Sequence, residues 1–221
     1  MPDRPAFKPG STVRFASPEF ARSIRGLLIA SAVGLAIGMA TAVAQGSLPE
    51  ALGSLANSSG SWCVCAFVIT MVERKPQWAA MAGFVSLVAM IAGYALAIEL
   101  LGYPAGAASL FVRWGAAAVV AGPALGVGAT WLRGPNGFRR AFGIAPIAGI
   151  LLGEGLYSLT VVAATTSVGY WIGELAVGLV AVVLAAVRLR NGPLIAVMLA
   201  TSAVASVIFY AVYTLVLGVP I

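Results

Sequence analysis

Histidine is absent from this chain of 221 residues, and cysteine occurs only twice, as Cys63 and Cys65. Without histidine the protein lacks the base of the common Ser–His and Cys–His nucleophile pairs and the commonest metal ligand. The two cysteines lie on different faces of a helix and lack the spacing of a metal or thioredoxin motif. We therefore interpret them as packing residues and predict no metal site, no cofactor and no enzymatic activity.

Charge is also scarce in this chain. Only 9% of the residues are charged and 61% are hydrophobic, with a mean hydropathy of +1.00. A soluble domain carries about a quarter charged residues, and no soluble core of this size hides so much apolar surface. The predicted fold class is therefore all-α, a polytopic bundle of transmembrane helices.

Seven apolar runs follow a polar N-terminal segment. Spanning a bilayer takes about 20 helical residues at 1.5 Å each, and six of the runs are long enough. The second is not, because its purely apolar part covers only residues 62–72. We predict a cytoplasmic tail at 1–23 and a transmembrane domain at 24–221, with spans at about 24–45, 54–72, 78–100, 108–132, 141–163, 168–187 and 193–217.

Basic residues indicate the orientation of these spans. All 13 lysines and arginines except Arg113 lie in the N-terminal segment or in the loops after the second, fourth and sixth runs. Lys and Arg collect on the cytoplasmic side of membrane proteins, so the N-terminus is predicted inside and the C-terminus outside. The same distribution explains the net charge of +6 without nucleic acid as a partner.

The first run has two features of a signal peptide, a basic flank and an Ala42-Val43-Ala44 sequence that resembles a cleavage site. However, its apolar stretch is longer than the roughly 7–15 residues of a secretory signal. We interpret it as an uncleaved first span.

Glu154 and Glu174 lie inside the fifth and sixth runs, where an ionisable group is costly and by default indicates a functional site. Glu154 follows Arg140 by 14 residues and Glu174 precedes Arg188 by 14, so both lie about 21 Å from the basic boundary. Consecutive spans are usually neighbours. The two carboxyl groups are therefore predicted at one depth on adjoining helices.

The polar segment Asn57-Ser58-Ser59-Gly60-Ser61 reaches the same layer when residues are counted back from Arg74. Backbone groups without hydrogen-bond partners are costly in hydrocarbon. We therefore predict that the second run is a locally broken span, buried in protein or lining a cavity, as in the binding sites of many transporters. The alternative is an external loop that leads into a short helix.

Further polar residues lie near this level. Tyr157 is one turn beyond Glu154, Tyr170 is one turn before Glu174, and Arg113 lies at the outer boundary of the fourth run. Arg113 can extend toward a carboxylate or toward lipid headgroups. The candidate site for a small solute or a proton thus comprises Glu154, Glu174, Arg113, Asn57, Tyr157 and Tyr170.

The alternative is that both glutamates are structural, one paired with Arg113 and one hydrogen-bonded to Ser, Thr or Tyr. If the two carboxyl groups are close and dry, one of them carries a proton at neutral pH, because like charge and removal from water both disfavour a second negative charge.

Gly-x-x-x-Gly pairs occur in three runs, at Gly34/Gly38, Gly122/Gly126 and Gly149/Gly153. Small residues at this spacing let helix backbones approach closely in lipid. We predict that the bundle packs through these faces.

Three phrases of the sequence suggest a known family: LANSSGSW at 55–62, GEGLY at 153–157, and Thr165-Thr166 followed by Tyr170-Trp171 and Glu174. On these phrases the chain resembles a bacterial family of small polytopic membrane proteins catalogued as domain of unknown function six-five-one-eight, over about residues 24–190. The resemblance implies the membrane class and assigns no activity, ligand or catalytic residue.

The favoured interpretation is a multi-pass protein of the bacterial inner membrane, transporter-like or ligand-sensing, with a polar pocket open to the external side. The alternative is a non-transporting partner or assembly protein, in contact with a second copy or another membrane protein, whose buried charges fix helix register. An external cavity that reaches Glu154 and Glu174 distinguishes the first interpretation from the second.

Overall fold

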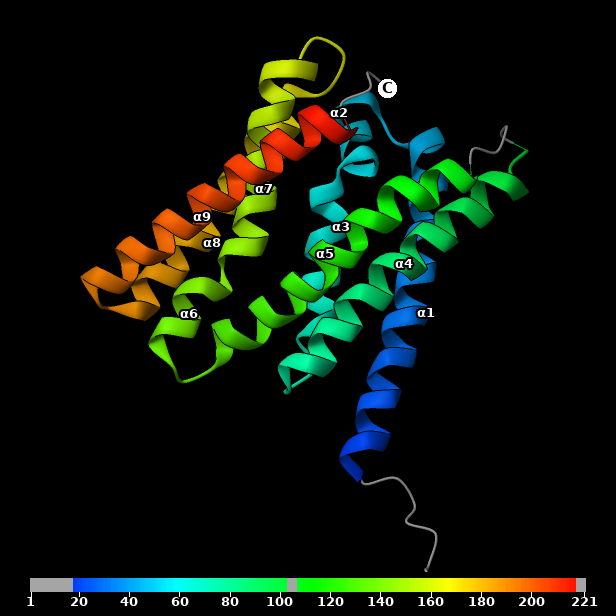
Figure 1. Ribbon diagram of the computed structural model, residues 1–221. Helices are drawn as coiled ribbons and strands as arrows, with labels where there is room; N and C mark the ends of the chain where they lie inside the picture. The colour runs from blue at the N-terminus through cyan, green and yellow to red at the C-terminus, as the bar shows by residue number, and fades with distance from the viewer. Residues whose placement is uncertain (1–17, 103–106, 218–221) are drawn as a thin grey trace, which may run out of the picture.

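The computed structural model describes residues 18–102 and 107–217, and every element in these ranges is helical (Figure 1). The elements are α1 (Pro18–Ser47), α2 (Glu50–Gly53), η1 (Ser54–Asn57), α3 (Ser59–Thr70), α4 (Pro76–Leu100), α5 (Ala107–Arg133), α6 (Gly137–Gly143), α7 (Ala145–Tyr157), η2 (Ser158–Val162), α8 (Val168–Leu189), α9 (Gly192–Val212) and η3 (Tyr213–Leu217).

Six stretches of helix are long and apolar enough to cross a membrane: Glu19–Ser47, Pro76–Leu100, Phe111–Arg133, Gly137–Val162, Val168–Leu189 and Gly192–Leu215. A seventh candidate is the bent pair of Glu50–Asn57 and Ser59–Thr70, whose axes differ by 59°. These findings confirm the prediction of an all-α polytopic bundle with about seven spans.

The bent pair runs back along α1 from one end to the other. Near the end of α1, Gln45 Nε2 donates to Asn57 Oδ1 at 2.8 Å, and near its beginning, Ser23 Oγ donates to Glu73 Oε2 at 3.5 Å. The chain between Asn57 and Glu73 therefore crosses the bundle, and we count it as one span. This agrees with the prediction of a locally broken second span.

The first helix begins earlier than predicted. α1 starts at Pro18, whereas the sequence analysis placed the start of the first span at residue 24. Proline suits the first position of a helix, because the N–H that it lacks has no partner there. The rest of the predicted tail, residues 1–17, lies outside the described residues.

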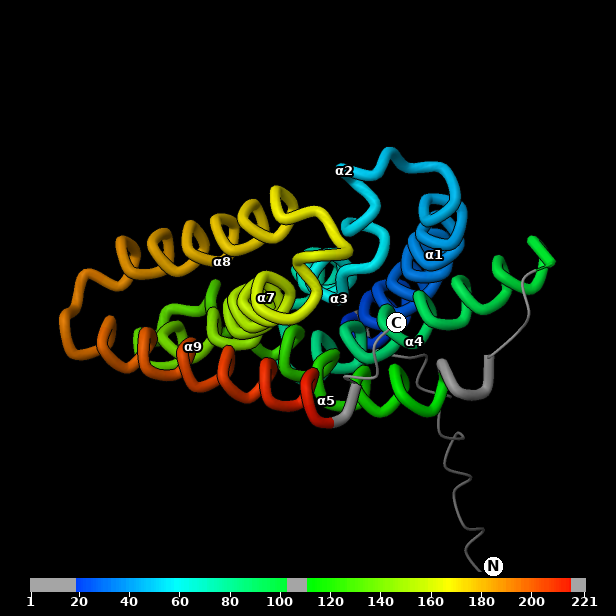
Figure 2. Tube along the Cα trace, turned by 90° about the horizontal axis from the view of Figure 1, so that it is seen from above, coloured from blue at the N-terminus to red at the C-terminus, as the bar shows by residue number. Residues whose placement is uncertain are grey.

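The long helices form two groups that α3 connects. α1 packs along α4 and α4 along α5, while α7 packs against α8 and α9. α3 contacts α4 and α5 on one side and α7 on the other, and Figure 2 shows it between the two groups. The beginning of α3 therefore lies where residues from both groups can meet it.

Glycines allow the close approach within each group, as the three Gly-x-x-x-Gly pairs predict. A Cβ added to Gly34 of α1 would lie 2.5 Å from the Ser86 carbonyl oxygen of α4, and one added to Gly153 of α7 would lie 2.7 Å from the Ser206 carbonyl oxygen of α9. Gly122 of α5 meets the backbone of α4 in the same way. Side chains at these positions would force the helices apart.

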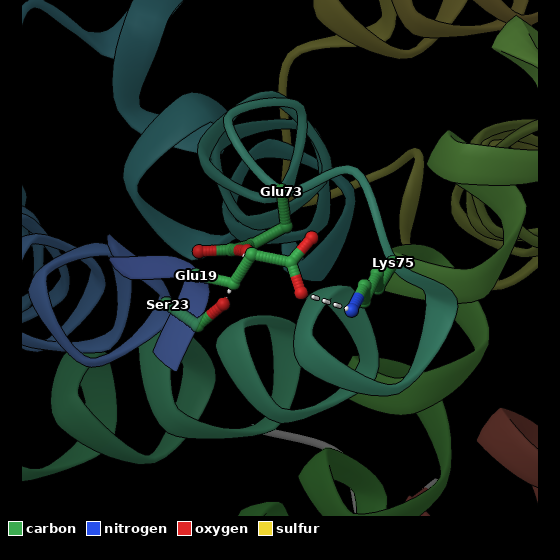
Figure 3. A network of polar contacts seen from close by, with 4 residues as sticks. All are labelled: Glu19, Ser23, Glu73 and Lys75. Atoms are coloured by element: carbon green, nitrogen blue, oxygen red, sulfur yellow. Dashed lines mark hydrogen bonds and ion pairs between the residues drawn. The ribbon is translucent and has the colours of Figure 1, made fainter. Parts of the chain in front are cut away.

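Basic residues gather at one end of the bundle, which we call the basic end: the beginning of α1 and the loops after α3, α5 and α8. Here Lys75 Nζ lies 2.7 Å from Glu19 Oε2, and Glu73 lies beside Ser23 of α1 (Figure 3). Arg133 of α5 donates to the carbonyl oxygen of Met71 at 2.6 Å and to that of Glu73 at 2.7 Å. These contacts fix the loop after α3 to α1 and α5.

Candidate functional site

The beginning of α3 is capped by its own serine. Ser58 has an extended backbone (φ −85°, ψ 127°), and its hydroxyl oxygen accepts a hydrogen bond from the Ser61 N–H at 3.1 Å. Serine is a preferred residue for this position. A helix start leaves further N–H groups without a partner, and these need an acceptor from elsewhere at this depth in a membrane.

Glu154 of α7 supplies that acceptor. Its Oε1 accepts hydrogen bonds from the N–H and the hydroxyl of Ser59, both at 2.9 Å. Its Oε2 accepts from the Ser58 hydroxyl at 3.1 Å and from the Gly60 N–H. Because the positive end of a helix and charge-assisted hydrogen bonds both favour an anion, Glu154 acts as a cap for α3 supplied by another helix.

Glu174 of α8 approaches the same place without a partner. Its side chain is 6% exposed, and neither carboxyl oxygen forms a hydrogen bond with any described residue. A Cβ added to Gly60 would clash with Glu174 Oε1 and would lie 2.8 Å from Glu154 Oε2. Two acidic groups therefore converge on one buried glycine, but only Glu154 has hydrogen-bond donors.

The two predicted tyrosines differ in their relation to this carboxyl pair. Tyr170 is half-buried and lies close to Ser58 and to both glutamates. Tyr157 is buried in an aromatic cluster, with its ring centroid 5.9 Å from that of Tyr210 and 4.9 Å from that of Tyr213. Tyr170 is therefore placed beside the carboxyl pair, and Tyr157 within the aromatic cluster.

A groove of about 1000 Å³ lies between α5 and α9, with α3, α4 and α7 contributing to its walls. Along α5 its lining extends from Arg113 to Trp131, which is about 27 Å at the rise of an α-helix. This length is close to the thickness of the hydrocarbon core of a bilayer. Trp114 and Trp131 line it near the two ends, and the residues between them are apolar and mostly small: Ala116, Ala117, Ala118, Val120, Ala121, Ala124, Val127 and Gly128.

The groove and the carboxyl pair are separate sites that share the beginning of α3. Among the candidate residues, Asn57 and Arg113 line the groove. Ser58 and Ser59 line it as well, and both donate hydrogen bonds to Glu154 on their other side. The other four candidate residues do not line the groove: Glu154, Glu174, Tyr157 and Tyr170.

Arg113 pairs with neither glutamate. It is exposed and forms no ion pair or hydrogen bond with any described residue. The structural alternative that paired one glutamate with Arg113 is therefore wrong. The reason is geometric: Arg113 lines the groove, and the first turn of α3 stands between the groove and Glu154.

Three polar residues of the groove, Gln45, Tyr94 and Tyr213, are not among the candidates predicted from the sequence. The Tyr94 hydroxyl donates to Gln45 Oε1 at 2.7 Å, and Gln45 Nε2 donates to Asn57 Oδ1. Tyr213 of η3 lines the groove and lies close to Glu154 and Ser59. Tyr94 could have been predicted from its depth. Counting from Lys75 places it about 28 Å from the basic end, which is near the depth of Arg113.

No curated protein and no solved structure matches this chain. A family model does match, over residues 17–219, which extends past both ends of the region where the sequence phrases suggested a resemblance. The expected family membership is thereby confirmed: this chain belongs to the family of unknown function DUF6518.

Proposed function

We propose that this multi-pass membrane protein binds a lipid-like amphiphile in the groove, with an apolar chain along α5 and an anionic head at Arg113. The observation that carries this proposal is an apolar groove that extends along α5 over about the hydrocarbon thickness and ends at an arginine with no described partner. Ligand pockets are typically concave and mostly apolar, with a few polar groups, and reach about 1000 Å³.

The polar end of the groove fits an anionic head. A guanidinium group offers several N–H donors in a geometry that suits carboxylate and phosphate. Gln45, Tyr94 and Asn57 line the same end, and their side chains bond to one another. This leaves the donors of Arg113 for the ligand.

Arg113 at the polar end of the groove favours an anionic amphiphile over an apolar transmembrane helix of a partner or of a second copy, because its N–H donors suit a carboxylate or phosphate. The alanines and Gly128 of the groove are nevertheless typical of helix–helix contacts, so docking of a helix is the second candidate.

The proposed setting is the bacterial inner membrane, with the basic end in the cytoplasm according to the distribution of Lys and Arg. Arg113 then lies at the outer leaflet, and the head of the ligand lies there too. In this proposal the protein acts as a carrier or a sensor, by binding and without a chemical step.

Tryptophan fluorescence tests this proposal, because Trp62, Trp114 and Trp131 line the groove whereas Trp78 and Trp171 do not. The probe is phosphatidylglycerol with brominated acyl chains, added to the protein in detergent. We expect it to quench the fluorescence at a lower concentration than brominated phosphatidylcholine does. No quenching by either lipid would contradict the proposal.

Variants separate the head from the chain of the ligand. Arg113→Gln is expected to remove the preference for the anionic lipid, about 5-fold, since one basic residue near a membrane surface contributes about 1 kcal/mol. Ala121→Leu, in the groove, is expected to weaken quenching by both lipids, whereas Ala176→Leu, at an exposed position of α8, is not. Self-association that Ala121→Leu abolishes would instead indicate helix docking.

A further inference from the structure

We propose that Glu154 and Glu174 form a proton-binding site, in which the pair holds one proton, carried by Glu174, while Glu154 stays ionised at the beginning of α3. The site is separate from the groove, so the inference does not depend on the ligand proposed above. It rests on the contacts of Glu154, on the burial of Glu174 and on the charge of the groups around them.

Glu154 is placed as an anion. Both of its oxygens accept hydrogen bonds, and two of the four donors are backbone N–H groups of Ser59 and Gly60, which cannot reverse their role. A proton on Glu154 would occupy an acceptor position that these donors use. The positive end of α3 adds to the preference for the charged form.

Glu174 is placed as a neutral acid. Glu174 is only 6% exposed, and no described residue donates a hydrogen bond to its carboxyl oxygens. An isolated ionised carboxylate away from water is costly, and the charge of Glu154 beside it adds repulsion. A proton on Glu174 removes both costs.

No basic side chain is found among the groups that face the pair in the described part of the chain. These groups are Ser58, Ser59 and Cys63 at α3, Tyr170 on α8 and Tyr213 on η3. Each of them is neutral in its protonated form. A proton is therefore the positive charge that can balance the second carboxyl group.

Loss of this proton would act on α3. A second negative charge would then lie beside Glu154, whose hydrogen bonds hold Ser59 and Gly60 in place. Repulsion between the two carboxylates would draw them apart and weaken the cap. The pair thus links the protonation of Glu174 to the position of the first turn of α3, which is also a wall of the groove.

Infrared spectroscopy of the purified full-length protein tests for this proton directly. At neutral pH we expect a carbonyl band of a protonated carboxylic acid in the wild type, lost in Glu174→Gln. Glu73→Gln is the matched control, because Glu73 is the one buried glutamate of the described residues outside the pair, at 5% exposed. Absence of the band in the wild type, or its retention in Glu174→Gln and loss in Glu73→Gln, would overturn the proposal.

The pH dependence of thermal unfolding gives a second, independent readout. Glutamine has the shape of a protonated glutamate, so Glu174→Gln is expected to fold and to keep its apparent Tm as the pH is raised above neutral. The wild type is expected to lose apparent Tm over the same range, as the folded protein gives up the proton. Parallel profiles for the two proteins would overturn the proposal.

Discussion

The two ends of α3 are held by opposite charges that come from different helices. At the basic end, Arg133 of α5 donates to two carbonyl groups of the loop after α3, and at the other end Glu154 of α7 accepts from the first N–H groups of the helix. Both signs match the helix dipole. Arg133 is exposed and its acceptors are neutral, whereas Glu154 is 1% exposed and has a second carboxyl group beside it.

This difference follows from the length of α3. Its 12 residues extend about 18 Å, which is less than the hydrocarbon thickness of about 30 Å. One end can therefore reach the membrane boundary, where water can complete any missing hydrogen bond. The other end must begin inside, where only protein groups can do so.

The largest expected effect is that of Glu154→Gln at the inner start of α3. The amide loses the charge, and its nitrogen cannot accept from the N–H groups of Ser59 or Gly60. We expect a loss of about 3 kcal/mol or more in the free energy of unfolding, since a buried charge-assisted cap is broken. The measurement is thermal unfolding in detergent beside the control Glu50→Gln, an exposed glutamate of α2. Equal stabilities of the two variants would contradict the expectation.

Arg133→Gln is expected to have a smaller effect at the basic end. Water can replace the guanidinium at the exposed carbonyl groups, so we expect a loss of about 1 kcal/mol, typical of a basic residue at a helix C-terminus. Arg139→Gln is the matched control, because Arg139 is an exposed arginine near the same end. A loss as large as that of Glu154→Gln in the same unfolding assay would remove the contrast between the two ends.

Glu73→Gln is expected to have the smallest effect, and a pH-dependent one. Burial raises the pKa of Glu73 above its ordinary value of 4.5, while the Ser23 hydrogen bond and Arg22 oppose the shift. Because the pKa of Glu73 is higher in the folded than in the unfolded protein, protonated Glu73 stabilises the fold. This contribution to the free energy of unfolding is fully present below pH 4.5 and is lost as the pH rises through the folded pKa. Glutamine does not titrate, so the difference between the apparent Tm of Glu73→Gln and that of the wild type should become more favourable to the variant as the pH is raised from acidic to neutral. A constant difference would argue against this sign.

Depth along the chain could be predicted from the sequence with fair precision. The rise of an α-helix is constant and the basic residues mark one boundary, so counting placed Glu154, Glu174 and the segment 57–61 in one layer. The structure brings these residues together at Gly60. The broken second span was predictable for the same reason, since its polar residues fall at a depth where hydrocarbon cannot accommodate them.

The partners of these residues could not be predicted from depth alone. The side of a helix that a residue faces depends on how the helices rotate and cross, which is decided by packing over the whole bundle. Hence Arg113 was a possible partner for a glutamate in the sequence, but it lies on the groove side of α3 in the structure. The groove beside the alanines of α5 could not be predicted for the same reason, because it depends on which helices this face meets.

Hydrogen exchange at the amides of Ser59 and Gly60 tests most directly the central claim that Glu154 fixes the start of α3. The protein is compared with its Glu154→Gln variant in lipid nanodiscs, with the amide of Val68 in the same helix as internal reference. The account predicts slow exchange at both first-turn amides in the wild type and at least about tenfold faster exchange in the variant, the equivalent of about 1.4 kcal/mol. Equal exchange at these amides in the two proteins would contradict it.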